Sequence, residues 1–284
     1  KMAHDPVPAL VETHWLADNI DDSSIRIVDA SWHMPAAGRS GAAEFSAAHI
    51  PGAVFWDIDA VADPSSSLPH MMPDEATFAR HMKALGISND HHVVVYDNVS
   101  MMTSARAWWM LRAFGHDRVS LLNGGQVKWQ AEGRAVSDDA PSIPDVDFSA
   151  TFNPAMIRSL DDLRANIENP AAQVLDARSA GRFAGTDPEP RPECRSGHIP
   201  GSLNLPFNTL IDPDTATVRP QADLADRLAG AGIAPGRPVI TSCGSGITAC
   251  VLALALHLTG RDDVAVYDGS WTEWGSSPDT PVET

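Results

Sequence analysis

The chain has 284 residues, of which 43% are hydrophobic and 20% are charged, a composition typical of a globular protein of about two domains. No apolar run is long enough to span a membrane, so no transmembrane helix is expected. The formal net charge of −17 disfavours nucleic acids and anionic membranes as partners, so a site for an anionic substrate must be locally positive.

The cysteine content is low, with Cys194, Cys243 and Cys250 as the three cysteines. An odd, low number argues against a disulfide framework and indicates a reducing compartment, so we expect a cytoplasmic protein. Neither a C-x-x-C pair nor a His/Cys spacing typical of zinc ligands occurs, so no metal is expected. Nothing in the sequence indicates an oligomer, and a monomer is the default expectation.

Segments of the first half recur in the second half in the same order. The matching pairs are 27–30 with 174–177, HIPG at 49–52 with 198–201, 93–96 with 239–242, and Gly124 and Trp129 with Gly269 and Trp274. A repeat of nearly 150 residues indicates two whole domains, because solenoid repeats run only about 20 to 50 residues. We interpret His49 and His198 as structural turn residues, since they recur in both halves.

Short apolar runs alternate with helical patterns along each half. In the second half we predict strands at 173–175, 239–241 and 264–267, and helices at 223–228 and 247–258. Strands that alternate with helices are typical of an α/β fold. We therefore expect two tandem domains, each with a mainly parallel sheet flanked by helices.

The stretch 137–154 is rich in Pro, Asp and Ser and lacks periodicity, which indicates a linker. The predicted boundaries are a first domain at 1–140, a linker at 141–154 and a second domain at 155–284. The tryptophans are interpreted as core or packing residues; they include Trp108, Trp109, Trp129 and Trp274.

The loop that begins at Cys243 carries the strongest chemical signal. An apolar strand ends at Ser242, a long apolar helix begins near Ile247, and two glycines lie between them. Glycines before a helix N-terminus allow several backbone N–H groups to point at one anion. The positive helix end favours the thiolate form of Cys243, which is the nucleophile that sulfur transfer requires. This interpretation requires that the thiol is not sealed away from solvent.

A free cysteine is more often a small buried apolar residue, and this alternative applies to all three. The strand-to-helix turn favours a functional role for Cys243, whereas Cys250 lies among Ala, Val and Leu and is predicted to be core. Cys194 is predicted to be an incidental loop residue. The first half has Asp97 in place of the cysteine, and we expect that domain to be catalytically inactive because a carboxylate cannot carry sulfur.

Residues 243–248 (CGSGIT) resemble the active loop of the 3-mercaptopyruvate sulfurtransferases, a branch of the tandem rhodanese family in which the loop usually has the sequence CGSGVT. The resemblance covers essentially the whole chain. It implies two rhodanese-like domains, of which the second is catalytic and needs no cofactor. It also implies transfer of sulfur from 3-mercaptopyruvate through a Cys243 persulfide to cyanide or to a thiol such as thioredoxin or glutathione, with release of pyruvate.

The same resemblance implies the other site residues. Segment 181–191 matches the substrate-binding stretch, so Arg182 and Arg191 would hold the carboxylate and carbonyl of mercaptopyruvate, which suits the planar guanidinium. A proposed proton-handling set would consist of Ser245, His70 and Asp59. The remaining loop residues would contact the substrate, namely Gly244, Gly246, Ile247 and Thr248. By the residues alone, the two arginines and His70 could equally be solvated loop residues.

Three alternatives stay open. A thiosulfate sulfurtransferase would suit the fold, although that branch carries Arg and Lys where this loop has Gly244 and Ser245. A cysteine phosphatase requires an arginine six residues after the cysteine, where this chain has Ala249. A non-enzymatic persulfide carrier could use the same loop without a small-molecule donor.

Overall fold

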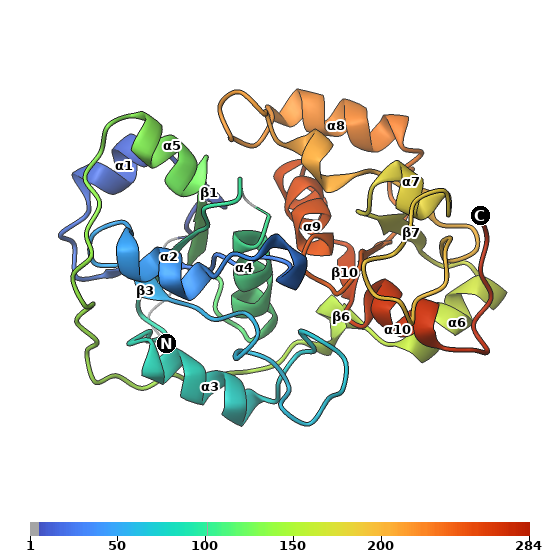
Figure 1. The fold of residues 1–284 in the computed structure, drawn as a ribbon, viewed down its shortest axis with the longest axis horizontal. Coiled ribbons are helices and arrows are strands. Elements are labelled where there is room, and N and C mark those ends of the chain that lie inside the picture. The colour runs from blue at the N-terminus through green and yellow to red at the C-terminus, as the bar shows by residue number, and fades with distance from the viewer. Residues whose placement is uncertain (1–5, 101) are drawn as a thin grey trace. The chain divides into compact units, whose positions relative to one another are not determined.

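The computed structural model describes residues 6–100 and 102–284, which form two compact units (Figure 1). The first unit holds the chain up to Pro64 together with Pro73–Phe152 and Asp212–Val218. The second unit holds Ser65–Met72, Asn153–Ile211 and Arg219–Thr284. Each unit therefore takes a short segment from the other half of the sequence, and the predicted continuous boundaries at 140 and 155 stay a prediction.

The first unit is built on a five-stranded parallel sheet with the strand order β1-β5-β4-β2-β3. Its strands are β1 (Leu10–Val11), β2 (Ile25–Asp29), β3 (Val54–Phe55), β4 (His92–Tyr96) and β5 (Val119–Leu122). Its helices are α1 (Thr13–Asp18), α2 (Gly41–Ala47), α3 (Glu75–Ala84), α4 (Ser104–Ala113) and α5 (Gly125–Ala131), with a short 3-10 turn at Pro35–Ala37.

The second unit repeats this plan with the strand order β6-β10-β9-β7-β8, again all parallel. Its strands are β6 (Ile157–Arg158), β7 (Gln173–Asp176), β8 (Leu203–Asn204), β9 (Val239–Ser242) and β10 (Val264–Tyr267). Its helices are α6 (Leu160–Glu168), α7 (Ala180–Phe183), α8 (Gln221–Gly230), α9 (Ala249–Leu258) and α10 (Ser270–Ser276), with 3-10 turns at Pro154–Met156 and Phe207–Leu210. The identical strand order confirms the internal duplication and the predicted α/β class.

The predicted elements of the second half agree with the structure except at one boundary. The three predicted strands lie within β7, β9 and β10, and the helix at 223–228 lies within α8. The helix predicted from residue 247 begins at Ala249 instead, because Gly246 adopts the left-handed backbone (φ 84°) and the chain turns before it can enter the helix.

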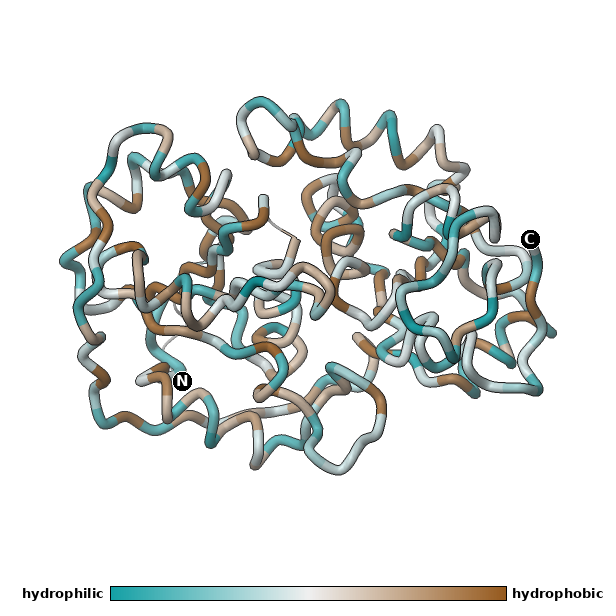
Figure 2. The backbone as a smooth tube through the Cα atoms, viewed as in Figure 1, coloured by the Kyte–Doolittle hydropathy of each residue, from teal (hydrophilic) through white to brown (hydrophobic). Residues whose placement is uncertain are grey.

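Helix α9 is apolar on every side, as its brown colour in Figure 2 shows. It is buried along its first two turns. It packs against β9 and β10 (Figure 1). The other face of this sheet is covered by Leu163 of α6 and by Trp271 and Trp274 of α10. A helix that is apolar all round is stable only when it is enclosed in this way. No helix in the described part of the chain is both long and apolar enough to cross a membrane.

The two HIPG segments form equivalent structural turns, as predicted. The ring of His49 stacks on Phe45 with centroids 4.1 Å apart, and its Nδ1 lies 2.7 Å from the Phe45 carbonyl oxygen. His198 stacks on Phe183 at 3.8 Å, with Nδ1 2.8 Å from the Phe183 carbonyl oxygen. The four tryptophans expected in the core are all buried, and they are Trp108, Trp109, Trp129 and Trp274.

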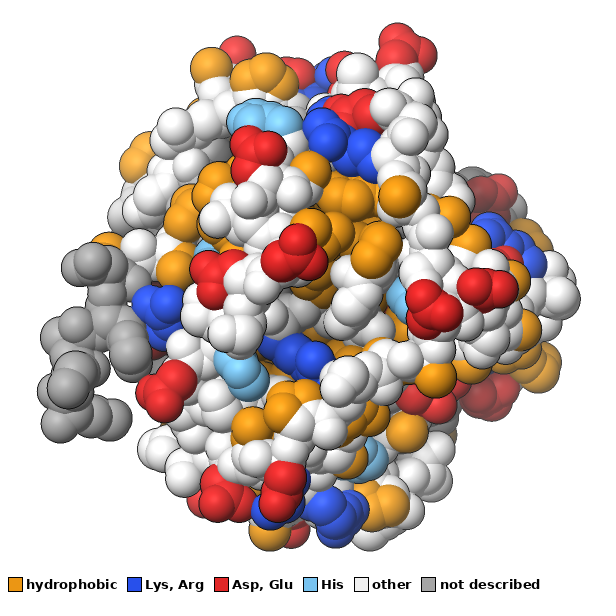
Figure 3. Space-filling view, turned by 90° about the vertical axis from the view of Figure 1, so that its left-hand side faces the viewer, with side chains coloured by type: hydrophobic (Ala, Val, Ile, Leu, Met, Phe, Trp, Pro, Cys, Tyr) orange, Lys and Arg blue, Asp and Glu red, His pale blue; other side chains and the backbone are white. Residues whose placement is uncertain are grey.

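The acidic excess does not gather into one patch on the face shown in Figure 3. Acidic side chains there are scattered among basic and apolar ones. The net charge of −17 is therefore spread thinly on this face, and a positive site must be built locally.

Candidate active site

The loop 243–248 joins the buried central strand β9 to helix α9, at the carboxyl end of the parallel sheet of the second unit. Ligand sites of such sheets form at this edge, because the strand ends and helix N-termini meet there. Gly246 turns the chain back, and its N–H donates a hydrogen bond to Cys243 Sγ at 3.1 Å. The loop therefore places at least one main-chain donor on the sulfur.

The start of α10 holds the carbonyl groups of this loop. The N–H of Trp271 donates to the Cys243 carbonyl at 2.9 Å, and Thr272 donates to the Gly244 carbonyl from its N–H at 2.8 Å and its Oγ1 at 2.6 Å. Four further loop amides have no hydrogen-bond acceptor within the described chain, namely those of Gly244, Ser245, Ile247 and Thr248. The loop thus has unused N–H donors beside Cys243, as an anion cradle requires.

Cys243 itself is more deeply buried than the sequence interpretation requires. Only 1% of the residue is exposed, so the expectation of a thiol open to solvent is wrong for this structure. The reason is that Cys243 directly continues a fully buried strand, while Ser270 and Trp271 hydrogen-bond to its backbone. In the mechanism proposed below, access of a donor to the sulfur would therefore require a local movement, and this stays a prediction.

The structure brings His70 and Ser245 together across 175 residues of sequence. His70 Nδ1 lies 3.0 Å from Ser245 Oγ, and both residues are buried. His70 belongs to Ser65–Met72, which packs with the second unit. The N–H of Met72 donates to Asp268 Oδ2 at 2.6 Å and so ties this segment to the end of β10. The serine–histidine pair is thereby fixed at the loop.

Asp59, the third member of the expected proton-handling set, belongs to the first unit. Its Oδ2 accepts a hydrogen bond from Trp32 Nε1 at 2.9 Å. Its part in a set with His70 and Ser245 stays a prediction.

Arg182 and Arg191 converge on the loop from segment 181–191. A Cβ atom built on Gly244 would lie 3.4 Å from Arg182 Nη2 and 3.9 Å from Arg191 Nη1. Two guanidinium groups therefore lie beside the residue that follows Cys243, which makes this part of an acidic protein locally positive. A side chain at position 244 would occupy the space in front of them, so glycine keeps it free.

Two residues that the sequence analysis missed support Arg182. Glu189 accepts from Arg182 Nη2 at 2.7 Å and from Arg178 Nη1 at 2.8 Å. Arg178 also contacts Asp176 at 2.7 Å. Burial by itself would lower the pKa of Arg178, but the carboxylates of Asp176 and Glu189 raise it above its ordinary value. A comparison of the halves could have found Arg178, because Ser31 stands in its place after the matching Asp29.

The other two cysteines have surroundings unlike those of Cys243. Cys250 is fully buried and its Sγ donates to the Gly246 carbonyl at 3.3 Å, which confirms its assignment to the core. Cys194 is half-buried with its Sγ 3.9 Å from the Trp271 carbonyl, and burial together with Glu193 raises the pKa of its thiol. A raised pKa disfavours the thiolate, as expected for an incidental loop cysteine.

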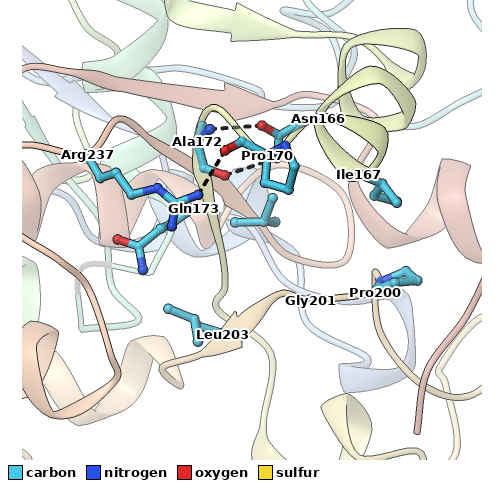
Figure 4. A pocket seen from close by; sticks show the side chains of 10 residues that line it. Asn166, Ile167, Pro170, Ala172, Gln173, Pro200, Gly201, Leu203 and Arg237 are labelled. Carbon is cyan, nitrogen blue, oxygen red and sulfur yellow. Dashed lines mark hydrogen bonds between the residues drawn. The ribbon is translucent and has the colours of Figure 1, made fainter.

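A hollow of about 370 Å³ lies near the amino ends of β7 and β9, away from the Cys243 loop (Figure 4). Arg237 is its only charged lining residue, and that side chain donates to the Pro170 carbonyl at 3.0 Å. Asn166 likewise bonds to the backbone of Ala172 at 3.1 Å. Its polar groups therefore stabilise local chain turns, and we assign no chemistry to this hollow.

Comparison with known proteins agrees with this geometry. The family described as "Rhodanese-like domain" matches residues 12–132 and again 159–277. The chain is 44% identical over 275 residues to the Escherichia coli 3-mercaptopyruvate sulfurtransferase, covering 96% of this chain and 97% of that protein. It is 42% identical over 296 residues to an Arabidopsis thaliana protein named "Thiosulfate/3-mercaptopyruvate sulfurtransferase 1, mitochondrial", covering 97% of this chain and 78% of that one.

Among solved structures, the chain superposes on the crystal structure of SseA from Escherichia coli, which is described as having the rhodanese fold of 3-mercaptopyruvate sulfotransferases. The TM-score is 0.85 at 40% identity, covering 93% of this chain and 99% of that one. With both halves matched by the family and relatives above 40% identity along nearly the whole chain, the protein belongs to the tandem-domain rhodanese family of sulfurtransferases.

Proposed function

We propose that this sulfurtransferase takes sulfur from 3-mercaptopyruvate and carries it as a persulfide on Cys243. The observation that carries the proposal is the convergence of Arg182 and Arg191 on Gly244, directly beside the cysteine and its unused loop amides. A pair of guanidinium groups suits a substrate that offers a carboxylate and a neighbouring carbonyl. Relatives whose names include 3-mercaptopyruvate support the same donor.

In the first half-reaction the Cys243 thiolate attacks the sulfur atom of 3-mercaptopyruvate. An S–S bond forms and the C–S bond breaks, and its electron pair passes to carbon as the enolate of pyruvate. The proton of the original S–H group then moves to that carbon, so pyruvate leaves and a persulfide anion remains on Cys243. The step is redox-balanced within the two reactants and needs no cofactor.

Ser245 and His70 are the groups that move this proton. With Nδ1 3.0 Å from Ser245 Oγ, His70 can pass a proton through the hydroxyl to the carbon that leaves. Asp59 would orient His70 in this scheme. Because both His70 and Ser245 are buried, the proton travels within the site rather than through bulk water.

The loop residues stabilise the charge on sulfur. The amide of Gly246 already donates to Cys243 Sγ. The N–H groups of Gly244, Ile247 and Thr248 are available to donate hydrogen bonds to the outer sulfur of the persulfide. Main-chain donors fixed in advance stabilise a developing anion without any cost of reorganisation. In the second half-reaction a thiol such as thioredoxin or glutathione, or cyanide in an assay, attacks the outer sulfur and regenerates the thiolate.

Thiosulfate is the second candidate donor, because one of the relatives is named for both donors. A dianion gains most from added positive charge in the loop, and here the loop carries Gly244 and Ser245. A pure persulfide carrier would have no use for the arginine pair. We therefore rank 3-mercaptopyruvate first.

The test is the initial rate with 3-mercaptopyruvate and with thiosulfate at matched concentrations, together with the intact mass of the protein after donor alone. We expect pyruvate release, preference for mercaptopyruvate and the mass of one added sulfur atom. Cys243→Ser should lose both the release and the added mass, whereas the matched variant Cys194→Ser should keep them. Substantial turnover by Cys243→Ser would refute the mechanism, and a clear thiosulfate preference would replace the donor.

A further inference from the structure

We propose that Glu189 makes the donor site selective for a singly charged anion, because it neutralises Arg182 and leaves Arg191 as the one uncompensated cation. The inference rests on the proposed function in one respect, since it takes Arg182 and Arg191 to be the groups that meet the donor. It assigns to Glu189 a specificity role in addition to its position behind Arg182.

Each of the two arginines Arg178 and Arg182 has one main carboxylate partner, Asp176 and Glu189 respectively. The side chains of Arg178 and Glu189 are 1% and 4% exposed, so their charges are not screened by water. Arg178 makes three contacts with Asp176, at 2.7, 3.1 and 3.2 Å, and Asp176 is the main partner of its charge. Glu189 approaches Arg182 through both oxygens, at 2.7 and 3.2 Å, and also accepts from Arg178 at 2.8 Å.

Two cations and two carboxylates thus balance within this cluster, and Arg191 makes no ion pair with any described residue. Asp187 and Glu193 on the same segment are exposed, and salt and water screen their charges. The charge that a donor meets beside Gly244 is therefore close to one positive unit. The single carboxylate of 3-mercaptopyruvate can pair with this cation, whereas the second charge of thiosulfate would lose its hydration without gaining a partner.

The consequence of removing the Glu189 charge follows from Coulomb's law. The interaction energy grows in proportion to ligand charge, so one extra positive unit at the site strengthens binding of a dianion twice as much as binding of a monoanion. A purely structural role for Glu189 predicts something else, namely an equal loss for both donors when Arg182 shifts.

The experiment compares Glu189→Gln with Glu189→Asp in the full chain. The Gln variant keeps the length and removes the charge, whereas the Asp variant keeps the charge and shortens the side chain. The measured quantity is the ratio of kcat/KM for thiosulfate to kcat/KM for 3-mercaptopyruvate, at low and at high salt. We expect the ratio to rise about tenfold in Glu189→Gln and to shrink again at high salt, with no rise in Glu189→Asp.

An unchanged ratio in Glu189→Gln would overturn the inference, and so would an equal rise in both variants. Should the Gln variant fail to fold, the wild-type protein supplies a second test with two anions of similar shape, methanesulfonate and sulfate. We expect the monoanion to inhibit at least as strongly as the dianion, because the second charge of sulfate loses its hydration in the site and meets no second uncompensated cation there. Stronger inhibition by sulfate would refute the charge assignment. If the wild type does not turn over 3-mercaptopyruvate at all, it is the proposed function that fails, and the inhibitor pair still reports on the charge.

Discussion

The two halves of the chain place different groups at the equivalent strand end, Asp97 after β4 and Cys243 after β9. In the first half the Asp97 carboxylate accepts hydrogen bonds from the amides of Val99, Thr103 and Ser104, at 2.9, 3.0 and 2.7 Å. In the second half Cys243 Sγ accepts from Gly246, and four neighbouring amides have no acceptor among the residues that the structure describes. The donors of the first loop are thus occupied by the side chain of Asp97. The donors of the second loop remain available for an anion that forms or binds during the proposed reaction. This difference supports the prediction that the first half is catalytically inactive.

A second difference lies beneath the loops. Asp29 and Asp176 end equivalent strands, but only Asp176 has an arginine beside it, Arg178. Burial and the neighbouring Asp97 carboxylate raise the pKa of Asp29 to about 6. The second half thus compensates its buried carboxylate with a cation that also reaches Glu189, whereas Asp29 makes no ion pair with any residue that the structure describes.

The largest expected effect comes from giving the second loop the anion of the first. Cys243→Asp should lower turnover at least about a thousandfold, because the nucleophile is gone and a carboxylate occupies the cradle. The fold should persist, since the loop amides would gain the acceptor that Asp97 provides in the first half. Initial rates and a thermal melt measure the two effects. Loss of the fold would show that the two loops are not interchangeable cradles.

A smaller effect is expected from Asp29→Asn. Because the pKa of Asp29 is higher in the folded chain than in the unfolded chain, the folded state binds more protons between about pH 4 and pH 6. This contribution to stability is present at low pH and is lost as pH rises through 6. Relative to the variant, the wild type should lose up to about 3 kcal/mol of unfolding free energy between pH 4 and pH 7. Denaturant titrations measure it, and the exposed Asp22→Asn should show no such slope.

Asp97→Asn tests whether the carboxylate holds the first loop together. The asparagine offers one acceptor where the carboxylate offers two, so at least one buried amide loses its partner, at a cost of about 2 kcal/mol. Turnover per folded molecule should not change. The matched control is Asp74→Asn, an exposed helix cap at which asparagine serves equally well. A fall in kcat without a fall in stability would contradict the passive role of this loop.

The smallest effect concerns the residue that supports Cys243 from α10. Ser270 has a left-handed backbone, φ 50°, where the first half has Gly125 at φ 54°, and its Oγ accepts from the Cys243 N–H at 3.1 Å. The left-handed backbone strains Ser270, but its hydroxyl accepts a hydrogen bond from the Cys243 N–H that glycine could not accept. Ser270→Gly should be more stable than Ser270→Ala by about 1 kcal/mol, because both lose the hydroxyl and only alanine keeps the strain. Chemical denaturation measures this order, and the reverse order would exclude strain at this position.

Much of the fold could be predicted from the sequence because the signals are local. The repeated segments, the apolar strands and the glycine-rich turn before an apolar helix specify two α/β units and place Cys243 at the end of a strand. The loop residues Gly244 to Thr248 are neighbours in sequence and so had to be neighbours in space. The start of α9 was misplaced by two residues, because the left-handed turn at Gly246 delays the helix and the apolar pattern of the sequence does not record that turn.

Only the tertiary structure shows what surrounds that loop. It brings His70 to Ser245 across 175 residues, turns Arg182 and Arg191 onto Gly244, and inserts Glu189 between two arginines. It also buries Cys243, although the motif by itself suggested an open thiol. The sequence determined the elements and the place of the proposed nucleophile, since local periodicity and turn chemistry encode them. The charge, the access and the proton partner of the site depend on contacts between segments far apart in the chain, which no local pattern records.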